Sequence, residues 1–199
     1  MTVYNINLGI GWASSGVEYA QAYRSTIFKN TGIKAKFVFM DMILADNIQH
    51  LTENIGFHDD EIIWLYNAFT DVKIAPTTYT IQQVLDSFSG DYIRFERDGK
   101  ICRFFYPKNQ FITCYLKDEK EDFVQCVEYV SQGRLLRKDY FSYVRYATEY
   151  FIPHEGKAGL CQRRFYQEDG TVAYDILLEK GREVLYRFPD KILFSKQEL

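Results

Sequence analysis

The segment with the most chemical content is the stretch NLGIGWASSGVEYAQAYR at residues 7–24. Small residues, from Ala13 to Gly16, separate a predicted strand from the first turn of a predicted helix. The free N–H groups and the dipole at such a helix start attract anions, and Gly16 would let a phosphate approach the backbone closely. The spacing matches neither G-x-G-x-x-G nor a lysine-bearing P-loop, so the nicotinamide and ATP fingerprints are absent. The segment predicts a phosphate-facing loop; the alternative is a tight turn capped by Ser15 and needed only for packing.

Several other side chains could take part in chemistry, and each has a plainer interpretation. Glu18 could be a catalytic carboxylate, but we favour a capping box with Ser15. Asp41 follows a predicted strand, where it could contact a ligand or hold the loop by hydrogen bonds. Trp12 could flank a sugar, or it could pack against the first helix. His50 is expected to be a structural side chain on a helix.

The four cysteines do not form a recognisable metal site. Cys102, Cys114, Cys126 and Cys161 include no C-x-x-C pair and have no histidine at ligand spacing. We therefore expect buried free thiols, and we expect no metal.

The elements that must position the loop are predicted by periodicity. The strand 2–9, the helix 16–28 and the strand 34–41 form a βαβ pattern, which implies a parallel pair. Three further helices are predicted, at residues 45–57, 59–71 and 80–88. Since only two parallel strands are clear, too few for a stable covered sheet, we expect the chain to be the N-terminal piece of a longer protein.

From Asp91 onward the apolar residues recur with a period of two. About seven strands are separated by turn signals, of which Asp98-Gly99 and Asp169-Gly170 are the clearest because both favour hairpins. This predicts an antiparallel meander. The predicted domains are a partial Rossmann-like segment over residues 1–88 and an inserted antiparallel β-sheet domain over 89–199.

Composition limits the class of protein. The 199 residues carry 24 Lys+Arg and 27 Asp+Glu, a net charge of −3, with 47% apolar and 17% aromatic residues. This composition is typical of a globular chain, and no apolar run reaches the roughly 18 residues of a membrane span. The N-terminus does not resemble a signal peptide. Near-neutral charge argues against nucleic-acid binding, so the aromatic meander is interpreted as a packed sheet or a protein-docking surface.

Three long stretches, taken in order, resemble the accessory Sec system glycosyltransferases of the GtfA type. They are NLGIGWASSGVEYAQAYR, FMDMILADNIQHLTENIGF and WLYNAFTDVKIAPTTYT, and the resemblance continues through RKDYFSYVRYATEYF and FYQEDGTVAYDILLEKG. These enzymes place N-acetylglucosamine on serine-rich-repeat adhesins. The resemblance covers essentially the whole chain.

The resemblance implies the fold class α/β plus antiparallel β: an incomplete N-terminal Rossmann-like half of a GT-B glycosyltransferase with a large inserted antiparallel β-meander. It implies UDP-GlcNAc as the donor, a retaining transfer without cofactor or metal, and catalytic residues outside this chain, which alone should be inactive. The loop that it places at the UDP diphosphate consists of Ser15, Gly16, Val17, Glu18 and Tyr19.

The resemblance also implies partners and a location. The acceptor would be a serine-rich-repeat polypeptide, and the β domain would assemble with a related non-catalytic subunit of the GtfB type or with itself. The protein would be cytoplasmic or peripheral at the inner face of the membrane, with no nucleic-acid partner. The rival interpretation is a non-enzymatic protein-binding module in which the βαβ part is only a support.

Overall fold

The structure, a computed structural model, describes residues 1–10, 16–154 and 156–199. Its contacts divide the chain into two compact units, residues 1–76 and residues 77–199. The division lies twelve residues before the expected boundary near residue 88. The reason is that the segment after Pro76 hydrogen-bonds to the large sheet: the Tyr79 N–H donates to Ser142 O, and the Val124 N–H donates to Tyr79 O.

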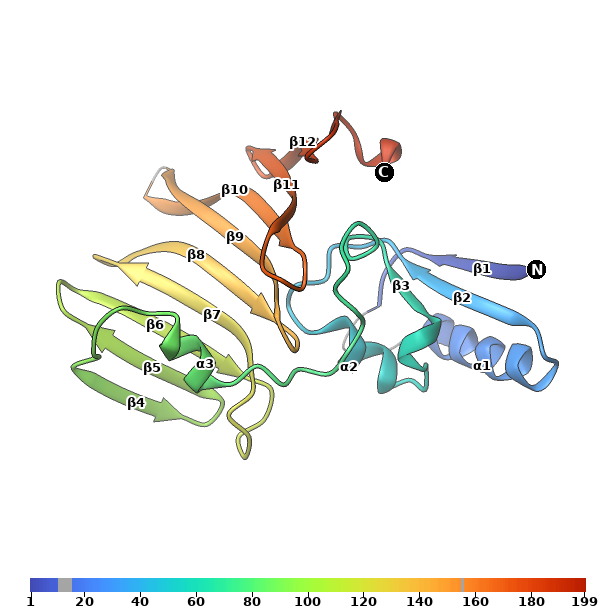
Figure 1. Ribbon diagram of the computed structural model, residues 1–199, viewed down its shortest axis with the longest axis horizontal. Helices are drawn as coiled ribbons and strands as arrows, with labels where there is room; N and C mark the ends of the chain where they lie inside the picture. The colour runs from blue at the N-terminus through green and yellow to red at the C-terminus, as the bar shows by residue number, and fades with distance from the viewer. Residues whose placement is uncertain (11–15, 155) are drawn as a thin grey trace. The chain divides into compact units, whose positions relative to one another are not determined.

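The first unit contains the parallel pair that the sequence predicts. Strand β1 (Thr2–Asn7) pairs in parallel with β2 (Lys34–Phe39), and helix α1 (Gly16–Asn30) connects them. Gly32, with φ +71°, follows the helix as the expected C-terminal glycine. Figure 1 shows α1 running alongside β1 and β2. This arrangement brings the carboxyl ends of both strands to the start of the helix.

The expected helix over residues 59–71 is wrong. A short 3₁₀ helix (Asp59–Glu61) leads instead into strand β3 (Ile62–Trp64), which pairs in parallel with β2. Ile62-Ile63-Trp64 is a β-branched and aromatic run, and pairing with β2 buries Ile62 and Trp64. Within the described residues the parallel sheet therefore has three strands, in the order β1-β2-β3, rather than two.

Helix α2 (Ile48–Glu53) confirms the second predicted helix, although it is shorter than expected. Its N-cap is Asn47, whose side chain accepts a hydrogen bond from the Gln49 N–H at 3.1 Å. The aromatic rings of Phe37, Phe39 and Phe57 pack between this helix region and the sheet. This small core holds the strand ends that form the site.

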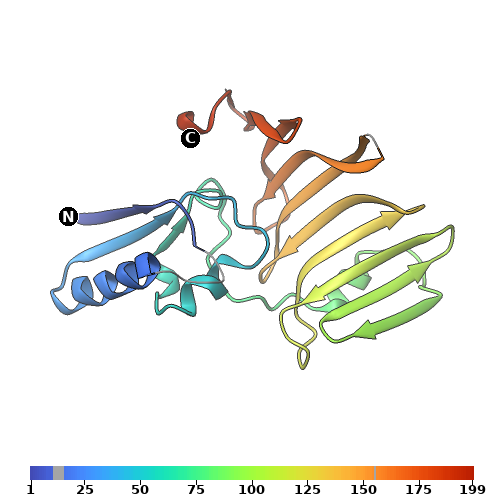
Figure 2. The same cartoon turned by 180° about the vertical axis from the view of Figure 1, so that it is seen from behind.

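The second unit is an antiparallel sheet whose strands follow one another in chain order, as Figures 1 and 2 show from opposite sides. Over the described residues it has ten strands, three more than expected. They are β4 (Arg94–Asp98), β5 (Ile101–Tyr106), β6 (Gln110–Leu116), β7 (Val124–Ser131), β8 (Arg134–Phe141), β9 (Arg145–His154), β10 (Lys157–Tyr166), β11 (Val172–Glu179), β12 (Arg182–Arg187) and β13 (Ile192–Leu193). Gly99 and Gly170 have φ values of +55° and +82° and lie in the predicted hairpin turns, but Asp98 and Asp169 do not have the positive φ of a type I′ turn.

Helix α3 (Ile81–Asp86) covers part of one face of this sheet. Thr80 and Gln83 form a reciprocal capping box at its start. Val84, on this helix, is buried together with Cys102 and Cys114 of the facing strands. The predicted fold class, a parallel α/β segment joined to a large antiparallel meander, is confirmed.

Candidate functional site

A cavity of about 640 Å³ lies at the carboxyl ends of β1 and β2, beside the first turns of α1. This is the place at which open α/β sheets bind ligands. The chain segments that line it are the end of β1, the loop after it, the start of α1 and the end of β2. The lining residues are Ile6, Asn7, Leu8, Gly9, Ile10, Val17, Glu18, Gln21, Phe39, Asp41 and Phe57.

Backbone and side-chain hydrogen bonds fix Asp41 at the edge of this cavity. The Asp41 N–H donates to Leu8 O at 2.7 Å, which ties the end of β2 to the end of β1. The Trp64 indole Nε1–H donates to Asp41 O at 2.8 Å, which ties the same residue to β3. All three strand ends therefore meet at Asp41, and its side chain lines the cavity.

Gly9 and Asp41 are in close contact across the cavity floor. A Cβ atom on Gly9 would lie 2.4 Å from Asp41 Oδ2, closer than real Cβ contacts allow. A side chain at position 9 would therefore push the exposed Asp41 carboxylate aside. The sequence alone placed Asp41 near a ligand but did not reveal this contact.

The predicted phosphate loop reaches the cavity only in part. Val17 and Glu18 line it, whereas Gly16 begins α1 and Tyr19, 57% exposed, is not among the lining residues. Ser15, and with it the proposed capping box, lies outside the described residues. A Cβ on Gly16 would meet no atom within 4 Å. The contact of these residues with a UDP diphosphate stays a prediction.

Gln21 is a lining residue that the sequence reasoning missed. It lies three residues after Glu18 and four after Val17, which places all three on one face of α1. Helical spacing from the two predicted residues could have identified it. Its side-chain amide adds a neutral donor and acceptor to the cavity wall.

The electrostatics of the cavity are unusual for an anion site. Its described lining carries two carboxylates, from Glu18 and Asp41, and no Lys, Arg or His. The positive contribution within this chain comes from the N-terminal end of the α1 dipole. Carboxylates and amides suit the hydroxyl groups of a ribose or a sugar, and a diphosphate in this cavity would need cationic side chains from elsewhere.

Glu61 is a buried carboxylate that anchors α1 from the opposite end of the sheet. It accepts hydrogen bonds from Ser25 Oγ at 2.7 Å and the His58 N–H at 3.0 Å, and Lys29 Nζ lies 2.9 Å away. Burial alone would raise the pKa of Glu61, but the hydrogen bonds from His58, Lys29 and Ser25 outweigh it and hold the pKa below its usual value. Glu61 is thus a structural tie between α1 and β3.

His50 has the structural environment expected of it. Its Nδ1 lies 2.7 Å from Asp46 Oδ2, one helical turn away, and the Asp46 carboxylate is buried. His50 is not among the residues that line the cavity, and Trp12 lies outside the described residues.

In the described part of the chain no cluster of His, Cys, Asp or Glu could hold a metal ion. No helix within the described ranges is both long and apolar enough to cross a bilayer.

Comparison with known proteins shows which proteins this chain resembles. Residues 94–190 match the family model described as the GtfA extended beta-sheet domain. Over 200 residues and all of its length, the chain is 70% identical to the UDP-N-acetylglucosamine–peptide N-acetylglucosaminyltransferase GtfA subunit of Streptococcus gordonii. The chain resembles the GtfA subunits over its whole length. It spans about 40% of the length of that relative.

Solved structures of GtfA proteins have the same fold as this chain. The structure of a GtfA/B complex matches all of the chain and 40% of its own chain, with a TM-score of 0.97 and 70% identity. The pneumococcal O-GlcNAc transferase GtfA, solved in complex with UDP and GlcNAc, matches 99% of the chain and 39% of its own, with a TM-score of 0.96 and 60% identity. The GtfA resemblance inferred from the sequence is confirmed.

Proposed function

We propose that this chain is the N-terminal part of a UDP-GlcNAc:peptide N-acetylglucosaminyltransferase of the GT-B class. The observation that carries the proposal is its 60% identity, at a TM-score of 0.96, to a GtfA that was solved with UDP and GlcNAc. In this proposal the cavity at the ends of β1 and β2 forms one wall of the donor site, and the transfer to Ser or Thr retains the anomeric configuration.

Within the donor site, the residues Ser15, Gly16, Val17, Glu18 and Tyr19 would face the UDP diphosphate. Gly16 supports this role because a Cβ there would meet no atom of the described residues within 4 Å, so packing against them does not require glycine. At Glu18 the backbone would face the diphosphate, whereas its carboxylate and that of Asp41 would face hydroxyl groups, since like charges repel. The cations that balance the diphosphate would come from the rest of the longer enzyme, and we expect neither metal nor cofactor.

The chain alone is expected to be inactive, because a GT-B donor site needs a second Rossmann-like domain. The apolar surface of the first unit supports the presence of such additional chain. Tyr4, Ile6 and Leu8, on alternate positions of β1 and the loop after it, are 61%, 70% and 77% exposed. Val17 and Tyr23 on α1 are 67% and 69% exposed. A surface of this kind on a small unit is usually covered by further protein.

The ten-stranded sheet would serve the assembly of the enzyme and the engagement of its acceptor. Its likeness to the GtfA chain of a GtfA/B complex supports a related GtfB-type subunit as the partner. The acceptor would be a serine-rich-repeat adhesin of the accessory Sec system, modified in the cytoplasm or at the inner face of the membrane. The comparisons do not favour the rival interpretation of a non-enzymatic binding module.

A charge-insertion variant tests the proposal in the longer transferase that contains this chain. Gly16→Asp would place a carboxylate beside the diphosphate, while the helix dipole favours an acid at this position and preserves the fold. We expect transfer of GlcNAc from UDP-GlcNAc to a Ser/Thr-rich peptide to be abolished and assembly with the partner subunit to persist.

The matched control is Asn54→Asp, which adds the same charge at an exposed position outside both the cavity and the apolar surface of α1. This variant should keep transfer near the parent level. Unchanged activity in Gly16→Asp would remove the loop from the donor site. Transfer by the 199-residue chain alone would show that the second domain is not required.

A further inference from the structure

The carboxylate of Asp41 is exposed in the cavity at the carboxyl ends of β1 and β2. Among the residues that the structure describes, no donor hydrogen-bonds to this carboxylate, and the hydrogen bonds of Asp41 all use its backbone. Its Oδ2 lies over Gly9, in the space that a side chain there would take. A carboxylate in this setting can accept hydrogen bonds from a ligand in the cavity.

The backbone of Asp41 is held from two sides, although it lies beyond the end of β2. Its N–H donates to Leu8 O at 2.7 Å, beside the end of β1. Its carbonyl accepts a hydrogen bond from the Nε1–H of Trp64, the last residue of β3, at 2.8 Å. The first bond joins two stretches of backbone, whereas the second uses the single donor of an indole side chain.

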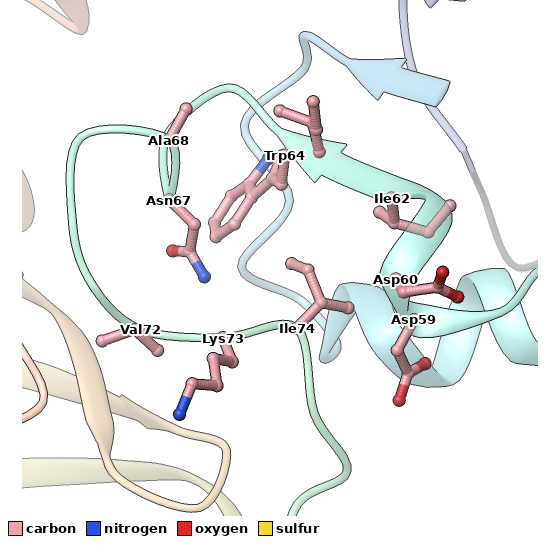
Figure 3. Close-up of a pocket in the computed structure, with 10 residues that line it drawn as sticks. Asp59, Asp60, Ile62, Trp64, Asn67, Ala68, Val72, Lys73 and Ile74 are labelled. Atoms are coloured by element: carbon pink, nitrogen blue, oxygen red, sulfur yellow. The ribbon is translucent and has the colours of Figure 1, made fainter. Parts of the chain in front are cut away.

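Trp64 reaches Asp41 from the interior of the first unit. It is 2% exposed, and its ring packs against Tyr66 with the ring centroids 5.6 Å apart. Figure 3 shows its indole nitrogen, drawn in blue, beside the light-blue segment that follows β2, while the rest of the ring lines a second cavity on the outer side of β3. Because a closely packed ring has one position, its N–H fixes the Asp41 carbonyl in one place.

The place of Asp41 in the topology indicates what its carboxylate would bind. In βαβ nucleotide-binding folds, an acid after the second strand accepts a hydrogen bond from a ribose hydroxyl, while the glycine-bearing turn before the helix faces the phosphates. Asp41 follows β2 and Gly16 begins α1, so this chain has both features in the same arrangement. Since a carboxylate only accepts hydrogen bonds and repels phosphate, the hydroxyl groups of a nucleotide sugar suit it.

We infer that Trp64 is a positioning residue of the donor site. Its indole N–H holds the Asp41 backbone so that the Asp41 carboxylate accepts a hydrogen bond from a ring hydroxyl of the bound nucleotide sugar, on the ribose or on the N-acetylglucosamine. Trp64 is buried and is not among the residues that line the donor cavity, so it acts through Asp41. This inference rests on the proposed transferase function and assigns two of its binding-site roles.

Isothermal titration calorimetry of the longer transferase with UDP-GlcNAc and with UDP tests the role of Asp41. Asp41→Asn keeps the shape of the side chain and removes its charge, so it should weaken the binding of UDP-GlcNAc about tenfold. An equal loss for UDP would place the hydroxyl on the ribose, and a loss confined to UDP-GlcNAc would place it on the sugar; either result supports the inference. The matched control is Asp60→Asn, at an exposed position outside the donor cavity, which should bind both ligands as the parent does.

A double-mutant cycle tests whether Trp64 acts through Asp41. Trp64→Phe removes the indole N–H and should weaken the binding of UDP-GlcNAc about threefold in the parent. In the Asp41→Asn background it should cause no further loss, because the carboxylate that it positions is then absent. Replacing Trp64 with 3-benzothienylalanine, which has nearly the same shape and no N–H, should give the same result and keeps the test available if Trp64→Phe does not fold.

Two results would overturn the inference and leave the proposed function standing. In the first, Asp41→Asn binds UDP-GlcNAc as tightly as the parent does. In the second, the loss caused by removing the Trp64 N–H is the same with and without the Asp41 carboxylate, as a purely structural role would require. A parent transferase that binds neither UDP nor UDP-GlcNAc would instead contradict the proposed function, and the inference with it.

Discussion

The carboxylate of Asp41 lies so close to Gly9 that a methyl group on Gly9 would sit 2.4 Å from Asp41 Oδ2. The contact joins the end of β1 to the end of β2, beside the hydrogen bond from the Asp41 N–H to Leu8 O. The contact therefore links Gly9, after the end of β1, to the side chain of Asp41, after the end of β2. Both residues line the candidate donor site.

The first prediction concerns Gly9→Ala. The new methyl group should displace the exposed Asp41 side chain and lower the free energy of unfolding by about 1 kcal/mol, the low end of the range for overpacking, since a flexible carboxylate can move aside. Thermal or urea unfolding of the chain measures this cost. The double variant with Asp41→Ala should recover most of it, because the two residues are in contact and their effects are not additive. An equal cost with and without Asp41→Ala would contradict the steric explanation.

The second prediction concerns Glu61→Gln. Removing the charge weakens the ties to Ser25, Lys29 and His58 and should lower the free energy of unfolding by about 1–3 kcal/mol at pH 7. Because the pKa of Glu61 is lowered in the folded state, its contribution is fully present above the unfolded pKa of about 4.3 and is lost as the pH falls through the folded value.

Urea unfolding of the parent and of Glu61→Gln between pH 3 and 7 measures this dependence. The difference between the two proteins should be largest above about pH 4.5 and should shrink in acid. Glu53→Gln, an exposed position on α2, is the control and should change little at any pH. A difference that grows in acid would show that the charged form of Glu61 does not stabilise the fold.

The fold could be predicted wherever local pattern and tertiary pairing agree. The Asp98-Gly99 and Asp169-Gly170 turns need positive φ, and both are hairpin turns in the structure. The secondary structure of the segment 59–71 could not be predicted correctly, because a short apolar run fits a strand or a buried helix equally well. Its pairing with β2 decides the outcome, and that pairing is not visible in the segment itself.

The predicted topology gave the location of the site but not the contacts between its residues. The carboxyl ends of parallel strands meet at the start of α1, so the loop and Asp41 were predicted at one edge. The contact of Gly9 with Asp41 depends on the register of β1 against β2, which no local pattern specifies. Val17 and Tyr23 lie on the predicted helix, and both side chains are exposed within the described unit.

The third prediction concerns the buried carboxylate of Asp175 in the large sheet. Arg164 Nε donates to it at 2.7 Å, and Arg187 donates to its other oxygen. Burial alone would raise the pKa of Asp175, but these hydrogen bonds hold it below its usual value. Asp175→Asn leaves both guanidinium groups without their charged partner.

We expect Asp175→Asn to cost about 2–4 kcal/mol at pH 7, less than a fully buried pair because the arginines reach solvent. The difference in the free energy of unfolding between the parent and Asp175→Asn should disappear as the pH falls through the lowered pKa of Asp175. Chemical unfolding monitored by circular dichroism measures both effects, with the exposed Asp190→Asn as the control. A cost no larger than that of the control would mean that the arginines find other partners.

The last prediction concerns the four cysteines, all of which are free thiols. Cys102 and Cys114 are fully buried, whereas Cys126 and Cys161 are only half-buried, so the expectation of buried thiols holds for the first pair. Burial raises the pKa of Cys114 to about 12, and it also raises the pKa of the other three thiols.

Since the thiolate is the nucleophile, we expect slow alkylation by iodoacetamide at pH 8 in the folded chain and fast alkylation in urea. Mass spectrometry of peptides over time should show Cys161 modified before Cys102 and Cys114. Early modification of Cys114 in the folded chain would show that the sheet opens locally between β5 and β6, because only opening can expose that thiol.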